Sequence, residues 1–62
     1  MMLHFTEAIS KSSIAINPKH VVAVFTATEG EQKGKTVISI INGNIAVDED
    51  YLETVGRLNA VE

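Results

Sequence analysis

The chain has no cysteine and no tryptophan, and its 62 residues include one proline, two phenylalanines and one tyrosine. The absence of cysteine excludes disulfide bonds and metal sites built on thiolates, and it is compatible with a reducing compartment. The two histidines, His4 and His20, are too few for a zinc site of the usual kind. We therefore predict a cytoplasmic protein that holds no metal and no cofactor.

Basic residues are also scarce: five lysines and arginines stand apart from one another against eight acidic residues, for a net charge of −3. Because non-specific binding to nucleic acid requires a basic surface, this balance argues against nucleic acid as a partner. No apolar run approaches the roughly 20 residues of a membrane span. The first residues also lack the pattern of a signal peptide. The sequence therefore predicts no membrane partner.

The length predicts a single small domain, residues 1–62. A chain of this size buries only about 60% of the surface of its unfolded state and is marginally stable. Small domains compensate with disulfides, a bound metal or association with other subunits. Because the composition excludes the first and argues against the second, we predict a homo-oligomer.

The strongest local pattern is a β-hairpin in residues 36–48. Asn42-Gly43 between apolar runs favours a two-residue type I′ turn, in which both central residues have positive φ. Centring the turn on these two residues pairs Ile40 with Ile45. Four large apolar side chains then share one face of the hairpin: Ile38, Ile40, Ile45 and Val47.

Three further strands are predicted before this hairpin. Residues 1–9 alternate with Leu3 and Phe5 on one face, and residues 13–17 form a short strand that ends at Asn17-Pro18. Residues 20–28 form the longest strand, and both of its faces are apolar. This pattern is typical of a central strand that is covered on both sides.

If the longest strand pairs beside the hairpin, one apolar sheet face remains uncovered. Its exposure would create a patch of a few hundred Å² or more, which is large for a monomer of this size. We predict that this face is the interface with a partner. Its residues are Val21, Ala23, Phe25, Val37 and Ile41.

Residues 48–58 change to a helical period, with apolar residues at Leu52, Val55 and Leu58. Asp50 and Glu53 fit a capping box at the start of the helix. So short a helix requires docking, and we expect it to cover the large apolar face of the hairpin. The predicted fold class is thus mainly β (α+β): a small antiparallel sheet, or a partly closed barrel, of four or five strands with one short C-terminal helix.

No arrangement of residues typical of catalysis occurs, and we predict that the chain is not an enzyme. Gly34-Lys35-Thr36 matches only the end of a phosphate-binding loop, and a strand rather than a helix follows it. Four clustered acidic residues lack the spacing of a calcium loop: Asp48, Glu49, Asp50 and Glu53. Helix capping and a solvated face explain these acids, and contact with a basic partner is the alternative.

Several segments resemble a group of small bacterial and phage-borne β-rich proteins, of which the FlbD-like flagellar proteins are the best known. The resemblance is carried by Ile16-Asn17-Pro18 before a strand, by the Asn42-Gly43 turn, and by Leu52-Glu53-Thr54-Val55 in the final helix. It implies a compact non-enzymatic protein that acts by binding other proteins. It implies no particular site residues.

We therefore expect a protein-interaction module of a bacterial or phage accessory kind. Its partners would be further copies of the chain and, in addition, an unidentified protein. Two alternatives stay open: a nucleic-acid-associated regulator that uses a dimeric β-sheet, and an acidic inhibitor of a basic host protein.

Overall fold

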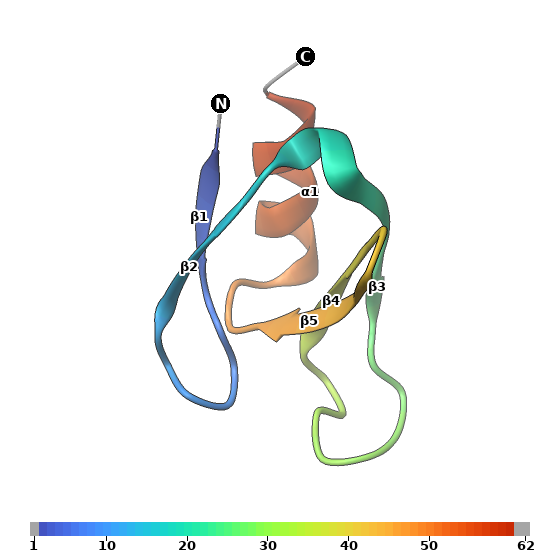
Figure 1. The fold of residues 1–62 in the computed structure, drawn as a ribbon. Coiled ribbons are helices and arrows are strands. Elements are labelled where there is room, and N and C mark those ends of the chain that lie inside the picture. The colour runs from blue at the N-terminus through green and yellow to red at the C-terminus, as the bar shows by residue number, and fades with distance from the viewer. Residues whose placement is uncertain (1, 61–62) are drawn as a thin grey trace.

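The computed structural model describes residues 2–60, and within this range the chain forms five β-strands and one α-helix (Figure 1). The strands are β1 (Leu3–Thr6), β2 (Ser13–Ile16), β3 (Val21–Thr26), β4 (Thr36–Ile40) and β5 (Gly43–Val47), and the helix α1 spans Tyr51–Asn59. All strand pairs are antiparallel, and the two sheets are not closed into a barrel. The predicted mainly-β fold with a C-terminal helix is confirmed. The predicted first strand also included Met1, which lies outside the described residues.

β1 and β2 form an antiparallel hairpin. Leu3 pairs with Ile16, and Phe5 pairs with Ile14. Side chains of paired residues point to the same side of an antiparallel ladder. The hairpin therefore presents one apolar face, and this face turns toward the second sheet.

Two connections in this half of the chain are held by side chains. The Glu7 carboxylate accepts hydrogen bonds from the Ser10 backbone N–H at 2.6 Å and from the Ser10 hydroxyl at 2.8 Å. These bonds hold the pKa of Glu7 below its usual value. The Asn17 side chain accepts a hydrogen bond from the Lys19 N–H at 3.0 Å, over a short 3-10 helix at Pro18–His20. The predicted end of β2 at Asn17-Pro18 is confirmed.

β4 is the central strand of the second sheet, whose order is β3-β4-β5. β3 pairs beside the hairpin as predicted, but the prediction that it is a central strand is wrong. The N-terminal hairpin joins the opposite edge: the Ala8 N–H donates to the Ala46 carbonyl, and the Asp48 N–H donates to the Thr6 carbonyl, both at 2.9 Å. Within the described residues, β3 therefore has one strand neighbour and one open edge.

The β4–β5 turn differs from the predicted type I′ turn. Ile40 pairs with Gly43 and Ile38 with Ile45, so the pairing is shifted by two residues and the turn is formed by Ile41 and Asn42. Neither turn residue has positive φ; Gly43 alone, the first residue of β5, has φ of +157°. Because side chains alternate with a period of two, a shift of two residues leaves every side chain on its predicted face.

A β-bulge interrupts the pairing of β3 with β4. Val21 pairs with Ile40 and Ala23 pairs with Ser39, which leaves Val22 without a partner in the ladder. The extra residue reverses the alternation on its N-terminal side. Val21 thus lies on the core face, against Ile40, instead of on the outer face where the sequence pattern placed it.

The core lies between the two sheets. Phe5, Ile16, Ile38 and Val47 are its buried residues, and Phe5 and Val47 come from elements far apart in the chain. The large apolar face of the β4–β5 hairpin is thus covered by β1 and β2, while α1 packs chiefly against β3. The expectation that the helix is the main cover of this face is wrong. The N-terminal hairpin instead supplies Phe5 and Ile16 to the core, with Leu3 and Ile14 packed against them.

The helix begins as predicted but turns a different face inward. The Asp50 carboxylate accepts a hydrogen bond from the Glu53 N–H at 2.7 Å, which confirms Asp50 as the N-cap. Leu52 is 80% exposed, whereas Thr54 is fully buried. The prediction that Leu52 lies on the docking face is wrong, since the inward face is centred on Thr54. Among the described helices, none is long and apolar enough to cross a membrane.

Arg57 ties the helix to β1. Its guanidinium donates to the His4 carbonyl at 2.8 Å and lies 5.4 Å from the centroid of the Phe5 ring. The same group is ion-paired with Glu53, one turn earlier on the helix. Glu53 therefore faces Arg57, and within the described residues the capping box is represented by the Asp50 hydrogen bond alone.

Candidate functional site

Three of the five predicted interface residues lie exposed on the outer side of the β3–β4–β5 sheet: Ala23, Phe25 and Ile41. Phe25 is 44% exposed, and Ile41, in the β4–β5 turn, is 67% exposed. Val37 belongs to the same face, where it pairs with Phe25, but it is buried. Val21 lies on the core face because of the bulge. We call Ala23, Phe25, Val37 and Ile41 the outer sheet face.

The bulge adds an exposed apolar residue that the sequence did not indicate. Val22, which the bulge leaves without a partner on β4, is 70% exposed. No residue type in Val21-Val22-Ala23 signals a bulge, so alternation alone placed Val22 on the core side. We call the side of β3 that faces away from β4, from Val22 to Thr26, the open edge.

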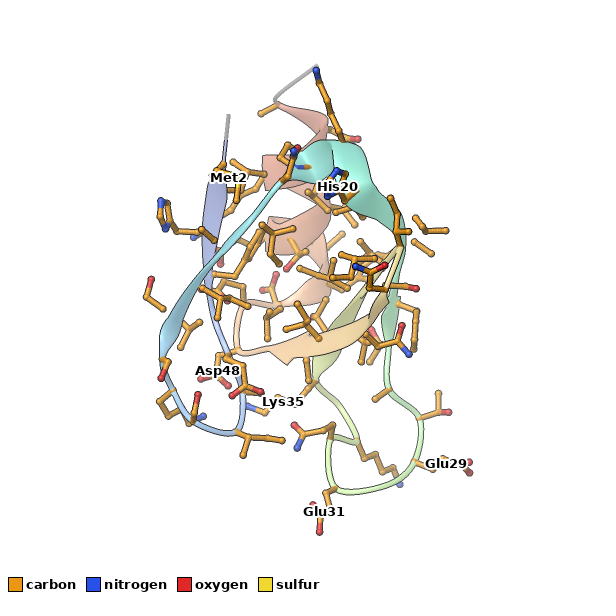
Figure 2. All side chains as sticks on the ribbon, in the orientation of Figure 1. Met2, His20, Glu29, Glu31, Lys35 and Asp48 are labelled. Atoms are coloured by element: carbon orange, nitrogen blue, oxygen red, sulfur yellow. The ribbon has the colours of Figure 1, made fainter. Side chains whose placement is uncertain are left out.

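The open edge carries no charged residue and no proline. Charges, prolines and short strands are the usual means by which proteins prevent edge strands from pairing with other chains. Here the charged residues lie beyond the two ends of β3: Lys19 lies before the strand, and Glu29 and Glu31 follow it in the loop at its far end (Figure 2). The bulge is the one protective feature present in the strand itself.

The backbone of the open edge can be assigned from the ladder. The Ala27 N–H donates to the Lys35 carbonyl at 2.9 Å, so residue 27 directs its backbone toward β4. In an antiparallel ladder, successive residues direct their backbone groups to opposite sides. The N–H and C=O groups of Val24 and Thr26 therefore point away from β4. Neither residue makes a backbone hydrogen bond to a third element within residues 2–60.

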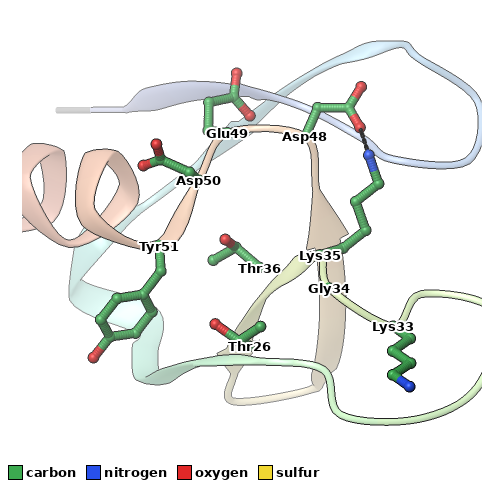
Figure 3. Close-up of a pocket in the computed structure, with 9 residues that line it drawn as sticks. All are labelled: Thr26, Lys33, Gly34, Lys35, Thr36, Asp48, Glu49, Asp50 and Tyr51. Atoms are coloured by element: carbon green, nitrogen blue, oxygen red, sulfur yellow. Dashed lines mark hydrogen bonds and ion pairs between the residues drawn. The ribbon is translucent and has the colours of Figure 1, made fainter.

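A polar cleft of about 400 Å³ lies on the other side of Thr26, between the end of β3 and the start of α1 (Figure 3). It is lined by Thr26, Lys33, Gly34, Lys35, Thr36, Asp48, Glu49, Asp50 and Tyr51. Its three carboxylates already have partners. Both oxygens of Glu49 accept from the Thr6 N–H, at 3.0 and 3.2 Å, and Asp50 caps the helix. The described residues contain no group of three acidic or histidine side chains placed to hold a metal ion.

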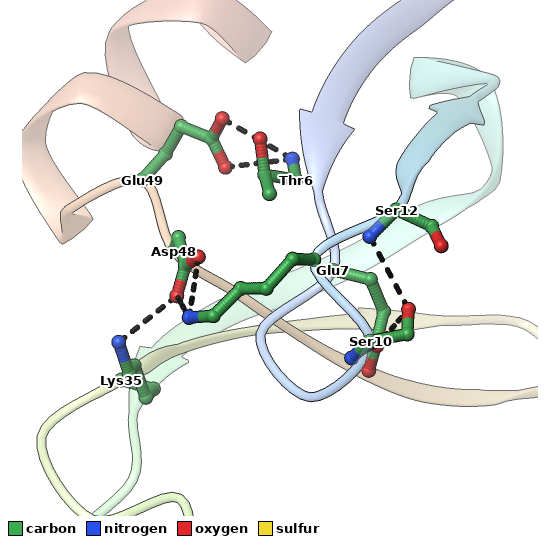
Figure 4. Close-up of polar contacts among 8 residues, drawn as sticks. Thr6, Glu7, Ser10, Ser12, Lys35, Asp48 and Glu49 are labelled. Carbon is green, nitrogen blue, oxygen red and sulfur yellow. Dashed lines mark hydrogen bonds and ion pairs between the residues drawn. The ribbon is translucent and has the colours of Figure 1, made fainter.

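Asp48 is the third carboxylate and the centre of a small ionic cluster (Figure 4). The Lys11 ammonium lies 2.8 Å from one carboxylate oxygen of Asp48, and the Lys35 ammonium lies 2.9 Å from the other. Hydrogen bonds from Lys11 and then from Lys35 hold the pKa of Asp48 below its usual value. The cluster ties the β1–β2 connection to both strands of the second hairpin. Sequence reasoning missed it because its members are separated by more than ten residues.

Comparison of the chain with protein-family models, curated proteins and solved structures finds no match in any of the three. The function is therefore inferred from the surfaces of the molecule. The cleft has its acidic groups engaged in holding the fold, whereas the outer sheet face and the open edge leave Val22, Ala23, Phe25 and Ile41 exposed within residues 2–60. The latter two surfaces are the stronger candidates for a functional site.

Proposed function

We propose that this chain is a small cytoplasmic, non-enzymatic protein-interaction module that associates with further copies of itself. The observation that carries the proposal is the exposure of apolar side chains on and beside an uncharged edge strand. Phe25, Ile41 and Val22 are all exposed there. Exposed apolar patches of this kind, when they are contiguous, mark interaction surfaces.

The small core supports the same proposal. Six hydrophobic side chains are buried within the described residues, and no disulfide is available to a chain without cysteine. Anything that binds the folded state but not the unfolded state stabilises the fold by mass action. Burial of Phe25 in a partner would add apolar surface to a domain that has little of it. The resemblance to FlbD-like proteins, which implies binding of other proteins, agrees with this role.

The non-enzymatic part of the proposal is supported by the cleft. Each of its carboxylates is engaged in an ion pair, a backbone hydrogen bond or a helix cap, so none is free to transfer protons without loosening the fold. General-base catalysis requires a side chain that is free to accept a proton and lies within hydrogen-bond reach of the substrate.

Solution mass measured by light scattering tests the proposal, with Phe25→Glu as the disrupting variant. Leu52→Glu is the matched control, because Leu52 is also exposed and apolar but lies on α1. We expect the native chain to exceed the mass of a monomer at about 100 µM. Phe25→Glu should reduce the mass to that of a monomer, and Leu52→Glu should not. A native chain that stays monomeric at this concentration would overturn the proposal.

A further inference from the structure

We infer that the second copy docks on the open edge of β3 by pairing its own β3 antiparallel to it, about a two-fold axis that places Val24 opposite Val24. The two sheets of three strands would then join into one sheet of six. This inference rests on the proposed self-association and adds the partner segment, its direction and its register. The occupant is a strand because the surface to be covered includes unpaired backbone donors and acceptors.

The backbone geometry selects the register. Only residues whose N–H and C=O groups point away from β4 can form hydrogen-bonded pairs across the new junction. Val24 and Thr26 meet this condition, as derived from the Ala27–Lys35 bond. With Val24 on the axis, its N–H donates to the carbonyl of Val24 in the second copy, and the reciprocal bond follows by symmetry. Thr26 of each copy then lies level with Val22 of the other.

The side chains of the outer sheet face fit the same register. Ala23 of one copy lies directly opposite Phe25 of the second copy, and the symmetric pair repeats the match. These two pairs occupy positions of the ladder that are not hydrogen-bonded, where side chains approach most closely. A small residue beside a large one lets the exposed Phe25 ring lie over the neighbouring strand. The edge is therefore complementary to itself, as a two-fold interface requires.

Charge at the ends of β3 favours the antiparallel direction. Lys19 lies before the strand and Glu29 lies after it, and both are exposed. An antiparallel arrangement brings the end of β3 that follows Lys19 in one copy beside the end that precedes Glu29 in the second copy. A parallel arrangement would instead set Lys19 beside Lys19 and Glu29 beside Glu29. Complementary charges set direction and register more than they set affinity.

The size of the contact indicates a reversible dimer. Stable interfaces bury about 800 Å² on each partner, which would be about a fifth of the 4130 Å² of exposed surface of this chain. A junction built on one strand of six residues buries less. The bulge at Val22 also limits the flat part of the edge. We therefore expect a dissociation constant of about 10 to 100 µM.

Two substitutions on the full chain test the open edge. Val22→Glu places a charge at the edge, and Ile9→Glu is its matched control, since both residues are 70% exposed and the change in net charge is identical. Thr26→Pro removes a backbone N–H that points away from β4, so the ladder with β4 keeps its hydrogen bonds. Sedimentation equilibrium should show at least tenfold weaker dimerisation for Val22→Glu and Thr26→Pro, and unchanged dimerisation for Ile9→Glu. Far-UV circular dichroism checks that each variant is folded.

Exchange of the charges at Lys19 and Glu29 tests whether the two β3 strands pair in the antiparallel direction. Lys19→Glu and Glu29→Lys should each weaken the dimer by up to about fivefold, as expected for exposed ion pairs. The double variant should recover the affinity of the native chain. If the native chain dimerises and Phe25→Glu disrupts the dimer, but folded Val22→Glu and Thr26→Pro still dimerise normally, the β3 pairing is overturned while the proposed function stands. A native chain that remains monomeric overturns both.

Discussion

Replacement of Thr54 by valine is expected to stabilise this protein. Thr54 is fully buried on the inner face of α1, and its hydroxyl has no hydrogen-bond partner within the described residues. A buried polar group left without a partner costs about 1 to 3 kcal/mol. Valine has nearly the same shape and is also β-branched, so its packing and helix propensity differ little from those of threonine. We expect a gain of about 1 kcal/mol, which corresponds to a rise in Tm of about 4 to 8 °C for a domain of this size.

Urea and thermal unfolding followed by far-UV circular dichroism measure this gain. Thr54→Ser keeps the hydroxyl and removes the methyl group, so it should lower the free energy of unfolding by about 1 kcal/mol. Thr28→Val is the control, because Thr28 is exposed in the loop after β3 and its substitution should change stability little. If Thr54→Val proves less stable than the native chain, the hydroxyl makes a hydrogen bond that stabilises the fold, and the reasoning is refuted.

Two further predictions concern the acidic residues between β5 and α1. Lys11 and Lys35 lower the pKa of Asp48 in the folded state. The ionised Asp48 carboxylate therefore stabilises the fold above the pKa that it has in the unfolded state, and this stabilisation is lost as the pH falls through the folded pKa. Asp48→Asn should therefore unfold at lower urea than the native chain at pH 7, with a difference that shrinks as the pH falls below the ordinary aspartate pKa of about 4; a constant difference would contradict the role of the ion pairs. Asp50→Ala should cost about 1 kcal/mol through loss of the helix cap, whereas Asp50→Ser should retain most of the stability; equal urea midpoints for the two variants would show that the cap contributes little.

Local patterns predicted the parts of the fold that depend on local chemistry. The alternation of Leu3 and Phe5 indicated the first strand and its apolar face, and the short strand at residues 13–17 was found where it was predicted. Asp50 was identified as the N-cap because a carboxylate three residues before a glutamate satisfies the first free N–H groups of a helix. In each case the residues that decide the structure lie within about fifteen positions of one another.

The β4–β5 turn shows how a local rule can fail while its consequence survives. Asn42-Gly43 matches the type I′ signature, but Gly43 is paired in β5 and the turn falls one residue earlier, on Ile41 and Asn42. The pairing moved by two residues, which preserved the faces. The bulge at Val22 had the opposite effect, because an insertion of one residue exchanges the faces on one side of it. It removed Val21 from the candidate interface and added Val22.

Long-range contacts account for the rest of what the sequence did not reveal. The exposure of Leu52 follows from the rotation of α1, and Arg57 helps to set that rotation through its contacts with His4 and Phe5. Apolar spacing along a short helix does not distinguish this rotation from one that buries Leu52. The cluster of Asp48 with Lys11 and Lys35 likewise joins segments that only the tertiary fold brings together.

The contact of Arg57 with His4 and Phe5 also determines when this chain can complete its fold during synthesis. Its members are separated by more than fifty residues, so this contact cannot form until the last turn of α1 has left the ribosome. The two hairpins can form earlier, because their strands are close in sequence. Closing the long loop between the ends of the chain has an entropic cost that falls on the final step. We therefore expect docking of the N-terminal hairpin to be the slow event of folding.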